Sequence, residues 1–315
     1  MFEQLGLIGC GLIGGSFALA LKRAGLVRRV VGYSKSPSTT ESARRLGVVD
    51  VEASSALLAV SGADLVLIAV PVAASEATFR AIRDGLSPGA LVMDVGSTKG
   101  DVVEAARRGL QDRFANFVPA HPIAGKEVAG IEHAEASLFD GKRVVLTPVD
   151  ETNQADTRRA AQVWSAIGAQ VVRMTPPSHD AAFAAVSHLP HLLAFAFVNS
   201  LAAQPDGAMF MQLAGPGFRD FSRIAASDPS VWRDILMSNR DQVLLQSRAF
   251  RETLLDLERQ IETGDGAALQ HCIAAARATR GPWRPDIALA APGAVSGPPS
   301  STALAQSNGS DGSEG

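Results

Sequence analysis

Three glycines near the start of the chain, Gly9, Gly11 and Gly14, have the spacing G-x-G-x-x-G that is typical of dinucleotide-binding loops. The pattern alone is common, but here it follows an apolar strand and opens an apolar helix, which is the context that binding requires. Gly9 allows a tight turn, Gly11 lets the backbone approach a pyrophosphate, and Gly14 permits close packing of helix on strand. We therefore predict a dinucleotide site that includes Leu12 and Ile13, with a glycine turn that binds nothing as the alternative.

The residues after the second strand indicate which dinucleotide binds. An acid is expected there for NAD, because a carboxylate holds the ribose 2′-hydroxyl. No Asp or Glu occurs between Glu3 and Glu41, and the strand is followed by Ser34, Lys35 and Ser36. Two hydroxyls and a cation suit a 2′-phosphate. The sequence thus favours NADP, with NAD as the alternative if Lys35 is only a solvated loop residue.

Two further polar loops follow predicted strand ends, where a doubly wound sheet keeps its chemistry. Ser97 lies in the first loop and His121 in the second. An imidazole near its usual pKa suits proton transfer at neutral pH, so His121 is a candidate base. A core histidine before a rigid proline turn is the competing interpretation. Lys99 lies at the start of the next helix, and a solvated lysine is one interpretation of it.

The elements that must position these loops alternate along the first half of the chain. Apolar runs predict strands over residues 5–8, 30–33, 65–70, 91–95, 117–120 and 144–146, with 171–174 as a further candidate. Helical segments are expected over residues 12–24, 74–85, 100–111 and 155–167. This alternation predicts an α/β fold, a doubly wound Rossmann-type parallel sheet, and we assign residues 1–176 to a dinucleotide-binding domain.

The second half of the chain is predicted to be helical throughout. We assign residues 177–283 to an all-α substrate and dimerisation domain, and residues 284–315, rich in Pro, Gly, Ser and Ala, to a disordered tail. The most apolar stretch, residues 181–198, contains two histidines and a proline, so we interpret it as a buried helix pair and not a membrane span. Its excess of apolar residues predicts an interface.

Composition excludes several classes of protein. The 315 residues carry a formal net charge of −3, with 46% hydrophobic and 19% charged residues, as in a well-packed soluble protein. This balance argues against nucleic-acid binding, which needs clustered Lys and Arg. Cys10 and Cys272 lie too far apart for a disulfide scaffold and fit a reducing cytoplasm. No Cys/His cluster has metal-ligand spacing, so we predict no metal.

Several segments together resemble the prephenate/arogenate dehydrogenase family. They are GCGLIGGS, AVPV, DVGSTKG, HPIAGKEVAG, LFDGK, VSHLPH and DFSRIAASDPSVWRDI. The resemblance implies an enzyme that transfers a hydride from a cyclohexadienol to a nicotinamide and releases the ring carboxylate as CO₂. Prephenate would then give 4-hydroxyphenylpyruvate, and arogenate would give tyrosine.

The resemblance also implies roles for individual residues. His121 would deprotonate or strongly hydrogen-bond the substrate 4-hydroxyl, and Ser97 would bond both that hydroxyl and the histidine. Arg223 would hold the ring carboxylate through a bidentate contact. We assign His191 to the substrate pocket and leave His188 as a structural residue. Val70 and Pro71, in the AVPV segment, are expected beside the cofactor.

Lys126 is predicted to influence the choice of substrate. Many relatives carry a small hydroxyl residue there, facing the substrate side chain, and a lysine would repel the ammonium of arogenate, so we expect prephenate to be preferred. Alternatively, Lys126 turns to solvent and pairs with an acid such as Glu127 or Glu132, which leaves the choice to Trp232 and the helical domain. Glu127 itself is expected at the mouth of the pocket, either gating entry by an ion pair or merely exposed.

The resemblance finally implies a homodimer that packs through the helical domains. Two other functions compete with this interpretation: another dehydrogenase of the β-hydroxyacid or 6-phosphogluconate type, and a dinucleotide-sensing protein that has lost catalysis. The HPIAG and SHLPH segments argue against the first. The presence of Ser97, His121 and Arg223 together argues against the second.

Overall fold

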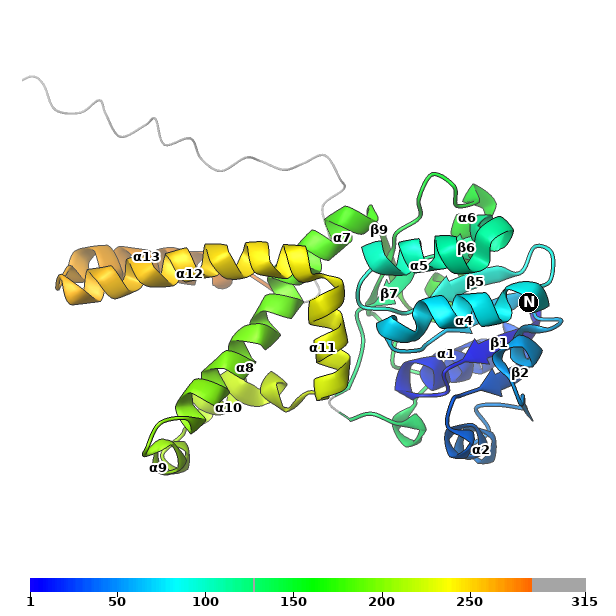
Figure 1. Ribbon diagram of the computed structural model, residues 1–315, viewed down its shortest axis with the longest axis horizontal. Coiled ribbons are helices and arrows are strands. Elements are labelled where there is room, and N and C mark those ends of the chain that lie inside the picture. The colour runs from blue at the N-terminus through cyan, green and yellow to red at the C-terminus, as the bar shows by residue number, and fades with distance from the viewer. Residues whose placement is uncertain (127, 285–315) are drawn as a thin grey trace, which may run out of the picture. The chain divides into compact units, whose positions relative to one another are not determined.

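A computed structural model describes residues 1–126 and 128–284, and its main feature is a six-stranded parallel sheet with the order β3-β2-β1-β4-β5-β6 (Figure 1). The strands are β1 (Phe2–Ile8), β2 (Val27–Tyr33), β3 (Val51–Glu52), β4 (Leu65–Ile68), β5 (Leu91–Asp94) and β6 (Phe117–Val118). The strand order reverses between β1 and β4, the switch point at which dinucleotides bind in such sheets. The predicted doubly wound fold is confirmed.

Helices cover both faces of this sheet because side chains alternate along each strand. Leu65 and Leu67 join one core, under α1 and α6, whereas Val66 and Ile68 join the other, under α3, α4 and α5. The helices are α1 (Leu12–Arg23), α2 (Pro37–Arg45), α3 (Ala56–Val60), α4 (Ser75–Ile82), α5 (Gly100–Leu110) and α6 (Gln154–Ala166). The short elements α2, β3 and α3 were not among the sequence predictions, because their apolar runs are too brief to show a period.

The predicted strand over residues 117–120 is in fact two strands in two sheets. A second, three-stranded sheet contains β7 (Ala120–Pro122), β8 (Arg143–Leu146) and β9 (Gln170–Arg173). Pro119 separates β6 from β7; it has no N–H to donate to a strand ladder, and the chain changes sheet there. Strand β7 pairs antiparallel with β8, so the predicted later strands do not extend the main sheet.

The described residues beyond β9 contain helices and no strand, which confirms the predicted helical half. Helix α7 (Pro176–Phe183) continues through a π turn (Ala184–His188) into α8 (Leu189–Ala202). The remaining elements are α9 (Gly207–Gln212), α10 (Pro216–Ser222), the 3₁₀ turn Arg223–Ala226, α11 (Pro229–Ser238), α12 (Arg240–Glu262) and α13 (Gly266–Arg280).

The prediction of a buried helix pair over residues 181–198 is wrong. Residues 176–202 form one continuous helical run. In its most apolar 18-residue stretch, only 22% of the residues are buried within the chain. Val186 is 72% exposed and Phe197 is 39% exposed. By length and composition alone this run meets the criterion for crossing a membrane, a criterion that core helices of soluble proteins also meet.

The described residues form two compact units, one within residues 1–251 and one within residues 252–284. In the second unit, the end of α12 and α13 form a hairpin in which Gln260 Nε2 lies 3.6 Å from Cys272 Sγ. The functional boundary at residue 176 stays a prediction. The predicted tail lies, apart from residue 284, outside the described residues.

Candidate active site

The glycine loop between β1 and α1 fits a dinucleotide pyrophosphate. Gly9 has φ +96°, and a Cβ there would lie 2.2 Å from the carbonyl oxygen of Ala69. A Cβ on Gly14 would lie 2.2 Å from the carbonyl oxygen of Gly9, whereas a Cβ on Gly11 would meet only open space. No side chain caps the N-terminus of α1, so the amides of its first turn, which begins at Leu12 and Ile13, are free for an anion.

The loop after β2 lies next to the glycine loop and carries no acid before Glu41. The Ser34 hydroxyl accepts a hydrogen bond of 2.8 Å from the Cys10 amide, which ties the two loops together. Lys35 and Ser36 are exposed, and Ser36 precedes α2 without capping it through its side chain. A cation, a hydroxyl and an uncapped helix start thus occupy the predicted 2′-phosphate position.

Val70 and Pro71 lie on the same edge of the sheet, directly after β4. The Ala69 amide, one residue earlier, donates to the carbonyl oxygen of Ile8 at 2.7 Å and so continues the β1–β4 ladder into the glycine loop. Pro71 is exposed and precedes a 3₁₀ turn. Their placement beside the glycine loop agrees with the predicted contact with a cofactor.

A cavity of about 640 Å³ brings together residues from both halves of unit 1. Among the side chains that line it are Ser97, His121, His188, His191, Arg223 and Trp232. The rings of His191 and Trp232 stack with centroids 3.5 Å apart and planes inclined by 18°. The cavity therefore gathers a hydroxyl, a guanidinium and several imidazoles that are separated along the chain.

His121 belongs to a chain of hydrogen bonds that leads away from the cavity. Its Nδ1 lies 2.8 Å from Nε2 of His179, and Nδ1 of His179 lies 2.8 Å from Oδ1 of Asp180. Burial lowers the pKa of His121 well below 6.5, and electrostatic interactions with His179, Lys99 and His188 lower it further, because these groups oppose a second positive charge beside them. His121 is therefore a neutral imidazole at neutral pH.

Lys99 is buried, which corrects its interpretation as a solvated lysine. Its ammonium donates to Oδ2 of Asp94 at 2.5 Å and to the carbonyl oxygen of Ala120 at 2.8 Å. Oδ1 of Asp94 also accepts from the Ala120 amide at 3.0 Å. Because Ala120 precedes His121 in β7, this ion pair connects the loop that contains Ser97 to the strand that contains the candidate base.

The two remaining cavity histidines have different hydrogen-bond partners. His188 Nδ1 accepts from Asn239 Nδ2 at 3.1 Å, and burial lowers the pKa of His188 to about 4. His191 Nδ1 donates to the carbonyl oxygen of Ser187 at 2.9 Å, and burial lowers its pKa as well. His188, interpreted from sequence as structural, therefore lines the cavity while being anchored by Asn239.

Lys126 lines a neighbouring cavity of about 630 Å³ together with Arg223 and Trp232, but its ammonium is already paired. It lies 2.8 Å from Oε2 of Glu135 and donates to the carbonyl oxygen of His133 at 2.9 Å. This geometry agrees with the alternative in which Lys126 pairs with an acid, although the acid is Glu135. Glu127 lies outside the described residues.

Known proteins match most of the chain. A family model described as "Prephenate dehydrogenase, nucleotide-binding domain" matches residues 17–173, and one described as "Prephenate dehydrogenase, dimerization domain" matches residues 175–275. The chain belongs to the prephenate dehydrogenase family. It is therefore an oxidoreductase with a nucleotide-binding domain followed by a domain of the dimerization type, as the sequence motifs indicated.

Individual members of the prephenate dehydrogenase family are similar along most of the chain. The prephenate dehydrogenase of Bacillus subtilis is 35% identical over 78% of this chain and 66% of its own length. The cyclohexadienyl dehydrogenase of Zymomonas mobilis is 34% identical over 84% of this chain and 91% of its own.

Solved structures of the family have the same fold. The prephenate dehydrogenase from A. aeolicus, in complex with hydroxyphenyl propionate and NAD⁺, is 35% identical with a TM-score of 0.83, covering 89% of this chain and 98% of that one. The Synechocystis arogenate dehydrogenase is 29% identical with a TM-score of 0.76, covering 89% and 99%.

Sequence analysis missed part of the site of this family member. His179 and Asp180 were passed over, although a histidine and an acid in the first turns after a Pro-Pro pair are visible in the sequence. Their contact with His121 spans 58 positions and appears only in the fold. In the described residues, no group of three or more His, Cys, Asp or Glu side chains has the geometry of a metal site.

Proposed function

We propose that the protein oxidises and decarboxylates prephenate to 4-hydroxyphenylpyruvate, with a nicotinamide dinucleotide as hydride acceptor, in tyrosine biosynthesis. One observation carries the proposal: Ser97, His121 and Arg223 line a single cavity. A hydroxyl, a neutral imidazole and a guanidinium match a substrate with a carbinol and a carboxylate on the same ring. The activities named for the relatives support the same reaction.

The proposed residue roles follow from the chemistry of that ring. When bound, the nicotinamide supplies the acceptor for the carbinol hydride. His121 takes the proton of the 4-hydroxyl as general base, because its lowered pKa keeps it neutral. Ser97 holds the same hydroxyl, and Arg223 orients the ring carboxylate, whose loss as CO₂ makes the ring aromatic. His191 and Trp232, stacked on each other, form a wall against which the substrate packs.

We propose NADP as the preferred cofactor, with NAD as the alternative. The proposal is supported by exposed Lys35 and Ser36 at the uncapped start of α2, whose first turn contains no acid. A 2′-phosphate is drawn to such donors, whereas a ribose hydroxyl gains little from them. The similar A. aeolicus enzyme was crystallised with NAD⁺, so the preference has to be measured directly.

We propose prephenate as the preferred substrate and arogenate as the poorer one. The charge of Lys126, at the edge of the substrate cavity, supports this order, although its pairing with Glu135 weakens the discrimination. An arogenate enzyme or a dual-specificity cyclohexadienyl dehydrogenase is the alternative, since relatives with such names are among the similar proteins.

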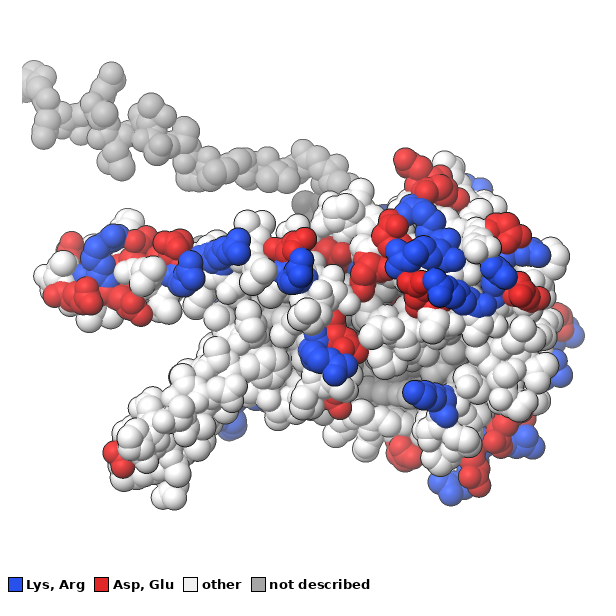
Figure 2. Space-filling model, in the orientation of Figure 1, with Lys and Arg blue, Asp and Glu red and all other residues white. Residues whose placement is uncertain are grey.

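We also propose a cytoplasmic homodimer that associates through its helical half, outside any membrane. The match to a dimerization domain supports it. Apolar side chains such as Val186, Phe197, Met209 and Leu213 are exposed in this half. Figure 2 shows few charged residues over α8 to α10 on the visible face, as suits a surface that a second copy covers.

The proposed function is tested by mixing the protein with prephenate and NADP⁺ and following the absorbance of the reduced cofactor. Parallel reactions with arogenate and with NAD⁺ measure both preferences. We expect turnover with prephenate, and the product is identified as 4-hydroxyphenylpyruvate. Absence of turnover with both substrates and both cofactors would overturn the proposal.

A further inference from the structure

We propose that His179 and Asp180 are positioning residues that fix the tautomer of His121, so that Nε2 of His121 is the unprotonated nitrogen offered to the cavity. The inference deepens the proposed function and rests on it for its catalytic consequence. The tautomer itself is a property of the free protein and can be tested without turnover.

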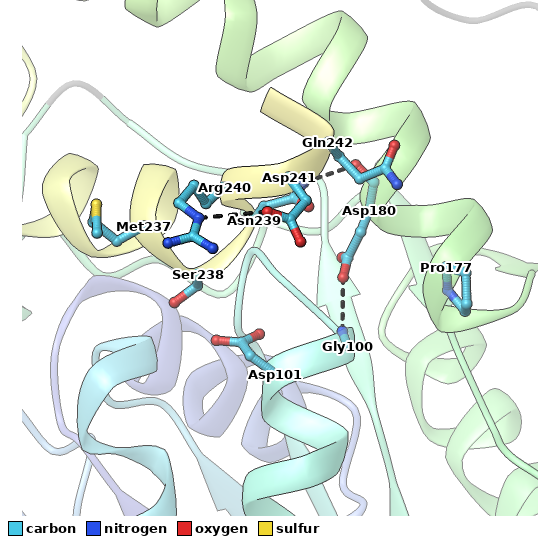
Figure 3. Close-up of a pocket in the computed structure, with 10 residues that line it drawn as sticks. All are labelled: Gly100, Asp101, Pro177, Asp180, Met237, Ser238, Asn239, Arg240, Asp241 and Gln242. Carbon is cyan, nitrogen blue, oxygen red and sulfur yellow. Dashed lines mark hydrogen bonds and ion pairs between the residues drawn. The ribbon is translucent and has the colours of Figure 1, made fainter. Parts of the chain in front are cut away.

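The carboxylate of Asp180 can accept hydrogen bonds but cannot donate one. Its Oδ1 accepts a hydrogen bond from the Lys99 amide at 2.8 Å, at the N-terminus of α5. Its Oδ2 accepts one from the Gly100 amide, also at 2.8 Å (Figure 3). Burial alone would raise the pKa of Asp180, but the bonds from His179, Gly100 and Lys99 outweigh burial and hold the pKa below its usual value. Asp180 is therefore ionised at neutral pH and has no proton to donate.

The second step assigns the proton of His179. Because Asp180 only accepts, Nδ1 of His179 must carry a proton and donate it over the 2.8 Å contact. Burial lowers the pKa of His179, although Asp180 acts in the opposite direction, so the ring is neutral. A neutral imidazole has one N–H, so Nε2 of His179 holds a lone pair and can only accept.

The third step assigns the proton of His121. Since Nε2 of His179 accepts, the atom 2.8 Å away, Nδ1 of His121, must be the donor. His121 is also neutral, so its single proton is on Nδ1. Nε2 then carries the lone pair, and it is the ring nitrogen left for a ligand in the cavity that His121 lines. A general base needs an unprotonated atom at that position.

The rings have little freedom to leave this arrangement. Phe183 stacks on His179 with centroids 4.4 Å apart and packs against His121 at 4.8 Å. Asn239 Nδ2 donates to the carbonyl oxygen of Asp180 at 2.8 Å, which holds α7 in place (Figure 3). The order of donors and acceptors is therefore built into the fold, as in other acid–histidine pairs that hold a catalytic imidazole.

In the proposed reaction, the hydrogen bonds from His121 through His179 to Asp180 can orient the His121 ring, but they are not needed to carry protons away from it. The proton that His121 takes from the 4-hydroxyl is needed again, because loss of CO₂ leaves a phenolate oxygen that is protonated in the product. The reaction thus releases no net proton. Asp180 borders a second cavity of about 430 Å³, but no proton has to leave through it.

The test is the protonation of each ring nitrogen by long-range ¹H–¹⁵N NMR of histidine-labelled protein, with His121 assigned by its loss in His121→Asn. We expect Nδ1 of His121 to be protonated and Nε2 to be bare. In Asp180→Asn and in His179→Gln we expect this tautomer to be lost and kcat for prephenate to fall about 10²–10⁴-fold, with little change in KM. His179→Gln keeps the carboxylate that caps α5, which separates the tautomer from capping.

Phe183→Leu is the matched control, because it loosens ring packing without touching the hydrogen bonds, and we expect the tautomer to persist in it. A proton on Nε2 of His121 in the wild type would overturn the inference, as would an unchanged tautomer in both His179→Gln and Asp180→Asn. If the wild type has the expected tautomer but turns over no cyclohexadienol, the proposed function fails while the assignment of the tautomer stands.

Discussion

The Lys99 ammonium lies 2.5 Å from Oδ2 of Asp94, and neither side chain reaches solvent appreciably, with exposed fractions of 0% and 3%. The pair joins the end of β5 to the start of β7 through Ala120. Removing two charges from water costs free energy. The attraction between the charges offsets this cost only when their geometry is good and further hydrogen bonds satisfy both groups. Here both conditions are met, and the pair holds Ser97 and His121 on one frame.

Breaking this ion pair should destabilise the protein strongly. We expect Lys99→Met to lower the free energy of unfolding by about 3–5 kcal/mol, because it leaves a buried carboxylate without a partner. The double variant Lys99→Met, Asp94→Asn should recover part of the loss. Urea denaturation of the three proteins checks this, and a double variant no more stable than the single one would contradict it.

Replacing the base should impair chemistry while sparing binding. We expect His121→Asn to bind the cofactor normally and to slow hydride transfer about 10²–10⁴-fold. Because the pKa of His121 lies well below 6.5, the wild type should stay on its activity plateau at pH 6.5, and the acid limb of kcat/KM should lie at lower pH. That limb should vanish in the variant. Wild-type turnover by His121→Asn would make His121 structural.

Acid should destabilise the protein through His188. Its pKa falls from 6.5 to about 4 on burial, so below pH 6.5 the unfolded chain binds a proton that the folded chain does not. Stability is therefore lost as the pH falls from 6.5 towards 4, by about 3 kcal/mol for this group. His188→Gln has no such proton, so its free energy of unfolding should depend less steeply on pH over that range. Parallel slopes for the two proteins would show that His188 titrates normally.

Lys35 should discriminate between the cofactors. We expect Lys35→Ala to weaken NADP⁺ binding by about 1.5–3 kcal/mol, the value of a hydrogen bond to a charged group, and to leave NAD⁺ binding nearly unchanged. Calorimetric titration of wild type and variant with both cofactors measures this. Equal effects on the two would mean that Lys35 does not contact the 2′-phosphate.

Lys126 and Glu135 should shift substrate preference in opposite directions. Lys126→Thr removes the cation, so the ratio of kcat/KM for prephenate to that for arogenate should fall. Glu135→Gln frees the ammonium from its 2.8 Å partner, so the same ratio should rise several-fold. If neither variant changes the ratio, specificity is set elsewhere in the cavity.

The glycine loop and the alternating strands were predictable because each depends on a local pattern of residues. The second sheet was not, because the departure of β7 from the main sheet depends on its antiparallel pairing with β8, more than twenty positions later. Lys99 looked like a solvated residue because nothing beside it in the sequence shows that Asp94 and Ala120 enclose it. His121 was found from its motif, whereas His179 needed the fold to bring it within reach.

The π turn at Ala184–His188 determines how α8, the helix that follows it, is rotated about its own axis. Such a turn holds one residue more than a regular α-helical turn, and each residue corresponds to roughly 100° of rotation about the axis. Deleting a single residue there would let the helix become regular and would turn α8 by about that angle. The ring of His191 would swing off Trp232, and the exposed apolar side of α8 would face another direction. The extra residue of the π turn therefore determines the direction of both the cavity wall and the outer apolar surface. The number of residues in this segment is accordingly more constrained than their identity.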